Sequence, residues 1–348
     1  MKRKILLIYT GGTIGMVQNA ETGALEVFNF KDIYTLLPML RLIEAHIDFY
    51  ALLPLIDSAD TNPNFWIRLA KLIEEKYDSY DGFVILHGTD TMSFTASALS
   101  FLLENLAKPI ILTGSQLPLG VLRSDGRDNI INSIEIAASY GKNEPCVPEV
   151  CLYFDNSLFR GNRTYKDNVR TFNAFSSSNY PKLAEVGVNI KYNYDAIMPC
   201  PKDKKLKLKV HTQLDNRVAI LKLYPGIRLE NVEAILSVPD LKAVVMETFG
   251  SGNAPGDPAF IALLKKAIER GVVIVSVTQC KGGGAVEIGK YASSFALGEI
   301  GVVSGFDITT EAAITKLMFL LGTNISKQEL IASMQQSLRG EMTNPQGK

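Results

Sequence analysis

Short runs of apolar, mostly β-branched residues alternate along this chain with longer segments of helical spacing. Parallel strands need a crossover connection, usually a helix, so this alternation is typical of βαβ units. The expected strands are residues 5–9, 48–53, 82–86, 110–113 and 150–154, then 218–224, 243–247, 272–277 and 300–303. Helical spacing follows Thr61 and Asn62, both candidate caps, and recurs in 130–138, 258–270 and 310–321. We therefore expect an α/β protein with mostly parallel sheets flanked by helices.

The length and one change of composition predict two domains. The chain has 348 residues, and a domain takes roughly 100 to 200 residues. Residues 198–215 combine two prolines with a lysine cluster between more regular stretches. We expect a larger N-terminal domain at 1–197, a linker at 198–215 and a smaller C-terminal α/β domain at 216–348. The lysines of the linker could contact nucleic acid, but an exposed strand is the simpler interpretation.

Composition excludes several classes of function. Lys plus Arg (36) balances Asp plus Glu (36), so the chain as a whole has no net attraction for phosphate backbones. No apolar run approaches the ~20 residues that cross a bilayer, and we expect a cytoplasmic protein without a membrane partner. The four cysteines form no CxxC pair, and there are only three histidines. A disulfide framework and a metal site are therefore disfavoured.

Polar side chains follow four of the expected N-terminal strands. The loops are residues 10–15, 57–60, 87–91 and 113–116, and all four carry hydroxyl groups. Ligands of open parallel sheets bind beyond the carboxyl ends of the strands, so these loops are the first candidates for a binding site. We expect them to contribute to a single site at one edge of the larger sheet.

The glycine-rich loop 10–15 does not match a nucleotide-binding motif. It lacks the GxGxxG spacing of dinucleotide sites, and no Lys-Ser/Thr pair completes a GxxxxGK[ST] loop. What remains is a tight turn that presents the hydroxyl of Thr13. Taken alone, this is as consistent with an ordinary strand-to-loop turn in which threonine acts as a cap.

A threonine hydroxyl is a weak nucleophile, so a catalytic role for Thr13 requires a base and a group that orients the base. Lys166 is the candidate base, because burial near Arg160 or Arg163 would favour the neutral amine that accepts a proton. The alternative is a surface lysine in a basic hairpin. Asp90 is the candidate orienting carboxylate, although a cap of the helix that follows it would explain the same residue.

At these residues the sequence resembles the bacterial type I, cytoplasmic L-asparaginases of the asparaginase/glutaminase family. Residues 9–16 (YTGGTIGM) and 81–92 (DGFVILHGTDTM) are similar to the two signature segments of that family. The likeness continues through ASALSFLLENL, TGSQLPL, LRSDGRDN, RGNRT, GNAP and TQC. It covers essentially the whole chain.

The resemblance implies hydrolysis of L-asparagine to L-aspartate and ammonia without cofactor or metal. Thr13 matches the nucleophile that forms an acyl-enzyme, while Thr89, Lys166 and Asp90 match the second hydroxyl, the base and the orienting carboxylate. A homodimer or homotetramer is also implied.

The resemblance further implies the substrate-binding residues. Asp90 and Ser58, with Asp57 alongside, would hold the α-ammonium and α-carboxylate groups of the substrate. Backbone N–H groups near Thr89 and Ser115 would stabilise the oxyanion.

The sequence departs from the family pattern in two regions. Many members carry a tyrosine in the mobile segment after the first signature, but residues 17–28 contain none, and Ala24 or Leu25 occupies its place. We expect this segment to act as a lid that excludes water. In the C-terminal domain Asn253 and Cys280 fit the effector site of some type I enzymes, whereas Glu247 stands where an arginine is expected, and Glu287 matches the glutamate of periplasmic members only poorly.

Two other functions are compatible with these residues. One methylene is worth only ~1 to 3 kcal/mol of discrimination, so a broader asparaginase/glutaminase remains open. A non-catalytic amino-acid sensor would use the same cleft for binding alone, although it would need neither Thr13 nor Lys166.

Overall fold

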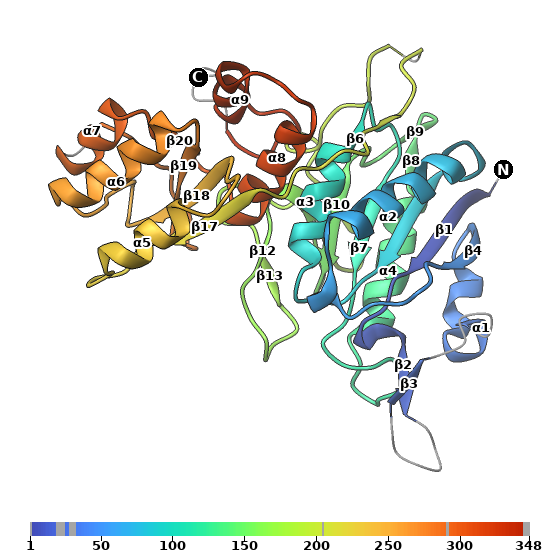
Figure 1. Cartoon of the computed structure of the whole chain (residues 1–348). Coiled ribbons are helices and arrows are strands. Elements are labelled where there is room, and N and C mark those ends of the chain that lie inside the picture. Colours follow the sequence, from blue (N-terminus) through green and yellow to red (C-terminus); the bar gives the residue numbers. More distant parts are fainter. Residues whose placement is uncertain (1, 19–24, 28–32, 204, 290–291, 344–348) are drawn as a thin grey trace. The chain divides into compact units, whose positions relative to one another are not determined.

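The chain divides into two units, residues Met1–Thr212 and Gln213–Lys348. The computed structural model describes residues 2–18, 25–27, 33–203, 205–289 and 292–343. Each unit has its own sheet and its own buried core (Figure 1). The expected α/β class, with a larger first sheet and a smaller second one, is confirmed.

The first unit contains an eight-stranded sheet in the order β15-β14-β11-β10-β7-β5-β1-β4. Five neighbouring strands are parallel: β1 (Arg3–Tyr9), β4 (Ala45–Ala51), β5 (Gly82–Leu86), β7 (Ile110–Thr113) and β10 (Val150–Phe154). They correspond to the five strands predicted from the sequence, although β4 begins three residues earlier than the expected 48–53. The remaining three extend one edge in antiparallel fashion: β11 (Ser157–Arg160), β14 (Ala184–Val186) and β15 (Ile190–Tyr192).

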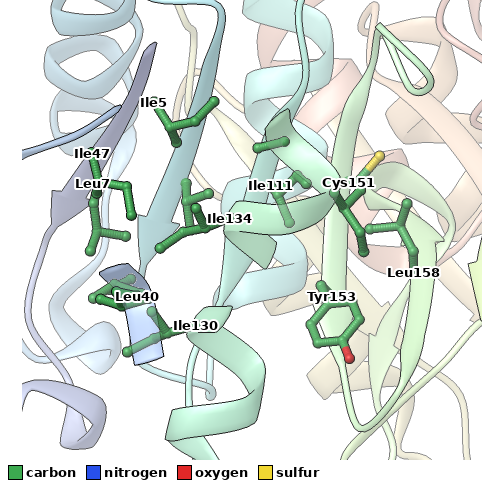
Figure 2. Close-up of a cluster of buried hydrophobic side chains, with 14 of the residues drawn as sticks. Ile5, Leu7, Leu40, Ile47, Ile111, Ile130, Ile134, Cys151, Tyr153 and Leu158 are labelled. Carbon is green, nitrogen blue, oxygen red and sulfur yellow. The ribbon is translucent and has the colours of Figure 1, made fainter. Parts of the chain in front are cut away.

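The helices of this unit follow from caps and apolar stripes. They are α1 (Ile33–Leu36), α2 (Pro63–Lys76), α3 (Met92–Leu102) and α4 (Gly126–Ala138). Asn62 caps α2, since its side chain accepts a hydrogen bond from the Phe65 N–H, and proline occupies the first helical position. Ile130 and Ile134 of α4 belong to one buried cluster with Ile5, Leu7 and Ile111 of the sheet (Figure 2).

Short strand pairs complete the first unit. They are β2 (Met16–Gln18) with β3 (Leu25–Val27), β8 (Tyr140–Gly141) with β9 (Glu144–Pro145), β12 (Tyr165–Lys166) with β13 (Phe175–Ser176), and β6 (Leu103–Glu104) with β16 (Lys209–Val210). The β16 pair involves the lysine-rich segment, whose side chains are largely exposed.

The second unit is a four-stranded parallel sheet in the order β17-β18-β19-β20. Its strands are β17 (Val218–Lys222), β18 (Ala243–Thr248), β19 (Val273–Thr278) and β20 (Val303–Ser304). Its helices are α5 (Leu229–Leu236), α6 (Pro258–Glu269), α7 (Ala292–Glu299), α8 (Thr310–Gly322) and α9 (Lys327–Met334). The last strand was expected at 300–303, but β20 is a two-residue strand that begins three residues later.

None of the helices in the described parts of the chain combines the length and apolar character needed to cross a membrane.

Candidate active site

The turn after β1 is built on two glycines that no other residue could replace without strain. Gly11 and Gly12 have φ angles of 125° and 89°, in the region that favours glycine. A Cβ atom on Gly12 would lie 2.6 Å from the Cα of Gly88. The turn that carries Thr13 therefore packs directly, backbone to backbone, on the loop after β5.

A second glycine contact brings in the loop after β4. A Cβ atom on Gly88 would lie 2.5 Å from the Oγ of Ser58, which is buried. The Oγ1 of Thr91 donates a hydrogen bond of 2.7 Å to the carbonyl oxygen of Ser58. Three of the four loops predicted at this sheet edge are thus stacked on one another.

Lys166 contacts two of the other predicted site residues. Its Nζ is 2.8 Å from the Oγ1 of Thr89 and 2.7 Å from the Oδ1 of Asp90. The lysine side chain is 16% exposed, whereas that of Asp90 is 66% exposed. Lys166 is therefore an enclosed amine and not a surface lysine.

The structure bears on the helix cap considered for Asp90 and on the surroundings of Arg160. Helix α3 begins at Met92 with Thr91 as its N-cap residue, so Asp90 pairs with Lys166 and does not cap the helix. Arg160 donates from its Nε to Glu149, 2.7 Å away, and from Nη2 to the Ala196 carbonyl oxygen. Its guanidinium is thus paired with a buried carboxylate.

These groups open into one cavity of about 460 Å³ in the first unit. All seven residues predicted from the sequence line it: Thr13, Asp57, Ser58, Thr89, Asp90, Ser115 and Lys166. The lining also includes Tyr9, Met16, Leu55, Ile56, Gln116 and Val169. Hydroxyl groups, two carboxylates and an amine therefore line a small space of mixed polarity.

Asp57 is partly engaged in its own loop. Its Oδ1 accepts a hydrogen bond of 2.9 Å from the N–H of Ala59, which caps the short 3-10 helix Ser58–Asp60. The exposed carboxylate retains further acceptor capacity toward the cavity.

The loop after β7 supplies hydrogen-bond donors. Ser115 is 4% exposed, and its Oγ has no hydrogen-bond partner among the described residues. Asp125 holds the next turn, because its carboxylate accepts hydrogen bonds from the N–H groups of Gln116 and Leu117. Burial raises the pKa of Asp125, against the effect of these hydrogen bonds.

Gln116 and Asp125 were not identified as site residues from the sequence. The Nε2 of Gln116 donates to the carbonyl oxygen of Thr171 at 3.2 Å, in the hairpin that carries Lys166. Gln116 thus connects the loop after β7 to this hairpin, and Asp125 holds the backbone of Gln116. Both residues lie in segments that resemble the family, TGSQLPL and LRSDGRDN. Nothing in the sequence gives them a chemical role, because the role depends on how the loops lie together.

Tyr9 is a third residue that the sequence did not indicate. Its hydroxyl lies 3.3 Å from the carbonyl oxygen of Gly12, and a Cβ atom on Gly15 would lie 2.1 Å from the ring carbon Cζ. Burial raises the pKa of Tyr9 to about 12, so its phenol remains protonated near neutral pH. Tyr9 therefore packs against the turn that presents Thr13.

The remaining sequence predictions concern residues outside this cavity. The expected lid falls largely on residues 19–24 and 28, which lie outside the described residues. In the second unit Glu247 accepts hydrogen bonds from the Nζ of Lys222 and the Oγ1 of Thr310, each 2.8 Å long. Within the described residues, no group of three or more His, Cys, Asp and Glu could hold a metal ion.

Family models match both units of the chain. The model "Asparaginase, N-terminal" matches residues 4–198, and "Glutaminase/Asparaginase C-terminal domain" matches residues 217–334. The chain belongs to the asparaginase family. The resemblance stated from the sequence is therefore confirmed.

Individual relatives place this asparaginase in the L-asparaginase I group. It is 44% identical to L-asparaginase 1 of Escherichia coli K12 over 345 residues, which cover 98% of each chain. It matches the crystal structure of L-asparaginase I from Vibrio cholerae with a TM-score of 0.88 and 43% identity, over 99% of this chain and 100% of that one. It is also 43% identical to the mouse 60 kDa lysophospholipase, covering 99% of this asparaginase and 63% of the relative.

Proposed function

We propose that this protein hydrolyses L-asparagine to L-aspartate and ammonia, with Thr13 as the nucleophile of an acyl-enzyme mechanism. One observation carries the proposal: the enclosed amine of Lys166 contacts both Thr89 and Asp90 in the cavity that Thr13 also lines. An enclosed amine beside a hydroxyl and a carboxylate is the arrangement that activates a weak oxygen nucleophile.

The polar groups of the cavity suit a short amino acid with an amide side chain. The exposed carboxylate of Asp90 can accept hydrogen bonds from an α-ammonium group. Ser58 and the N–H groups of the surrounding loops can donate to an α-carboxylate.

In the first half of the reaction, the Oγ1 of Thr13 attacks the amide carbon of the substrate, and its proton passes to the base. The carbonyl oxygen becomes an oxyanion, for which the N–H groups of Thr89 and Ser115 are the donors. The C–N bond then breaks, the leaving nitrogen takes up a proton, and ammonia departs from an ester on Thr13.

In the second half, water attacks this ester and its proton passes to the same base. The bond to the Oγ1 of Thr13 breaks, the hydroxyl of Thr13 is restored, and L-aspartate leaves. Lys166 must be neutral when it accepts a proton. Its contact of 2.8 Å with Thr89 suits donation by an ammonium and acceptance by a neutral amine.

Ammonia release from L-asparagine by the wild type and by Thr13→Ala tests the proposal. We expect release by the wild type and a loss of at least 10²-fold in the variant, as for other nucleophiles removed from a catalytic site. No release by the wild type would favour a non-catalytic sensor, and full release by Thr13→Ala would exclude this nucleophile. The same assay with L-glutamine separates a strict asparaginase from a broader asparaginase/glutaminase.

We also propose a cytoplasmic homodimer or homotetramer, which the likeness to the L-asparaginase I group supports. Sedimentation of the purified protein and fractionation of cells that express it test the two statements separately.

A further inference from the structure

His87 is a fully buried histidine that the proposed reaction does not use. It follows β5 directly, and its own backbone N–H donates to the carbonyl oxygen of Thr113 at 2.9 Å. Its ring nitrogens have two contacts: Nδ1 lies 2.7 Å from the Gly88 carbonyl oxygen, and Nε2 lies 3.0 Å from the Oγ1 of Thr95. The ring also meets the edge of Phe65.

The partners of the ring fix its protonation state and tautomer. Burial lowers the pKa of His87 to about 4, so the imidazole is neutral near pH 7 and carries one N–H. A carbonyl oxygen can only accept, so this hydrogen is on Nδ1 and is donated to Gly88. Nε2 therefore accepts from the hydroxyl of Thr95, which in turn accepts a hydrogen bond of 3.0 Å from the indole N–H of Trp66.

The carbonyl group that His87 holds belongs to the same peptide unit as the N–H of Thr89. This peptide is trans, and in a planar trans peptide the C=O and N–H point in opposite directions. With the carbonyl directed to the buried imidazole, the N–H of Thr89 is directed away from it. No described residue accepts a hydrogen bond from this N–H.

The peptide unit between Gly88 and Thr89 lies at the wall of the cavity. Gly88 and Thr89 line the cavity, whereas His87 does not. Gly88 packs between Gly12, on the turn of the nucleophile, and Ser58, so its backbone has little room on either side. If this peptide rotated, its carbonyl oxygen would take the direction now taken by the Thr89 N–H. A carbonyl oxygen in that direction would repel an oxyanion that the N–H would stabilise.

We propose that His87 is a positioning residue: its Nδ1–H holds the Gly88 carbonyl and thereby directs the Thr89 N–H toward the oxyanion of the reaction. This rests on the proposed function, because the oxyanion forms only if the amide is attacked. His87 touches no substrate atom, and it contributes through the peptide that it orients.

Two amide substitutions that differ by one methylene test the inference. In His87→Asn the amide nitrogen is bonded to Cγ, as Nδ1 is in histidine, so it can still donate to Gly88. In His87→Gln the amide nitrogen lies nearer the position of Nε2, within reach of Thr95 but not of Gly88. Both variants keep a polar group in the buried site.

We expect His87→Gln to lower kcat by about 10²-fold, the effect of losing one oxyanion donor, with KM changed less than about threefold. His87→Asn should retain kcat within about tenfold of wild type. Thr95→Val keeps the shape of the side chain and removes its hydroxyl, so it is the control for loss of the second hydrogen bond, and it should leave kcat within a few fold. Equal kcat in the two amide variants, or a loss in Thr95→Val as large as in His87→Gln, would overturn the proposal.

The amide resonance of Thr89 in protein labelled with 15N-threonine gives a readout that does not depend on turnover. We expect it to shift in His87→Gln and to stay close to wild type in His87→Asn. The opposite pattern would contradict the role of His87 even if the wild type did not hydrolyse L-asparagine. Absence of turnover in the wild type, with the expected resonance pattern, would instead count against the proposed function alone.

Discussion

The Nζ of Lys166 lies 2.7 Å from the Oδ1 of Asp90, yet the two side chains face different surroundings, at 16% and 66% exposure. The lysine is held inside the cavity wall, and the aspartate reaches from the same contact into the open space. One residue can therefore serve two purposes, since Asp90 orients the amine with one oxygen and keeps acceptor capacity for an ammonium group of a ligand. Thr89, 2.8 Å from the same amine, completes the arrangement.

Removing the amine should lower turnover strongly while the fold is retained. Lys166→Met keeps most of the side-chain volume but removes the group that accepts the proton, and general-base contributions are about 10² to 10⁴-fold in rate. We expect kcat for L-asparagine to fall within that range, measured by ammonia release. Lys182→Met is the matched control, because Lys182 pairs with Glu185 on the surface. Its kcat should equal that of the wild type, and a Lys166→Met variant within tenfold of wild type would exclude Lys166 as the base.

Alanine at Gly12 should damage both stability and activity. The substitution places a Cβ atom 2.6 Å from the Cα of Gly88 at a φ of 89°, so steric overlap adds to backbone strain. We expect a loss of about 2 to 4 kcal/mol in the free energy of unfolding of the first unit, and a lower kcat/KM.

Gly226→Ala separates the backbone strain from the steric overlap. Gly226 has a φ of 83° with nothing within 4 Å of its Cβ position, so the cost should be about 1 to 2 kcal/mol of strain alone. Its kcat/KM should match the wild type. If Gly12→Ala and Gly226→Ala lost the same stability in denaturant titrations, close packing of the loops would not be needed to explain Gly12.

The parallel strands and the site residues could be predicted because both follow from local pattern. Each strand is a short apolar run, and the carboxyl ends of parallel strands meet at one edge, which brings Thr13, Ser58, Thr89 and Ser115 together. Lys166 lies on a two-residue strand of a separate hairpin, so the strand pattern does not place it at this edge. It was a candidate base from its position near two arginines and from the resemblance.

The remaining features depend on contacts that have no local signal. The antiparallel strands β11, β14 and β15 are short, so they lack a distinctive run. The Asp125 carboxylate supports Gln116, nine residues earlier, and the His87 ring contacts the adjacent residue Gly88. Both contacts are short in sequence, but their bearing on the site appears only when the loops that carry them line one cavity. Residues of this kind are indistinguishable from ordinary polar residues until the chain is folded.

The buried imidazole predicts a loss of stability in mild acid. The pKa of His87 is about 4 in the fold and about 6.5 in an unfolded chain, so the unfolded state binds a proton first as the pH falls. The neutral ring therefore contributes its full stability above pH 6.5, and this contribution decreases as the pH falls toward 4.

Between pH 7.5 and pH 5 the loss should be about 2 kcal/mol in the free energy of unfolding. Carboxylates titrate nearby, so the quantity to measure is the difference between wild type and His87→Asn in urea titrations at the two pH values. The wild type should lose about 2 kcal/mol more than the variant. Parallel curves would show that His87 is not the group responsible.

A buried ion pair in the second unit gives a prediction that concerns stability alone. The Nζ of Lys316 on α8 lies 2.6 Å from the Oε1 of Glu341, and both side chains are fully buried. Lys316→Met leaves this carboxylate with the N–H groups of Leu338 and Arg339 as its donors among the described residues. Removal of one partner from such a pair costs about 3 to 5 kcal/mol. Adding Glu341→Gln should recover part of the loss, because the remaining buried group is then uncharged. Thermal unfolding of the single and double variants tests this, and a double variant less stable than Lys316→Met would mean that the carboxylate is stabilised by its backbone donors and not by the lysine.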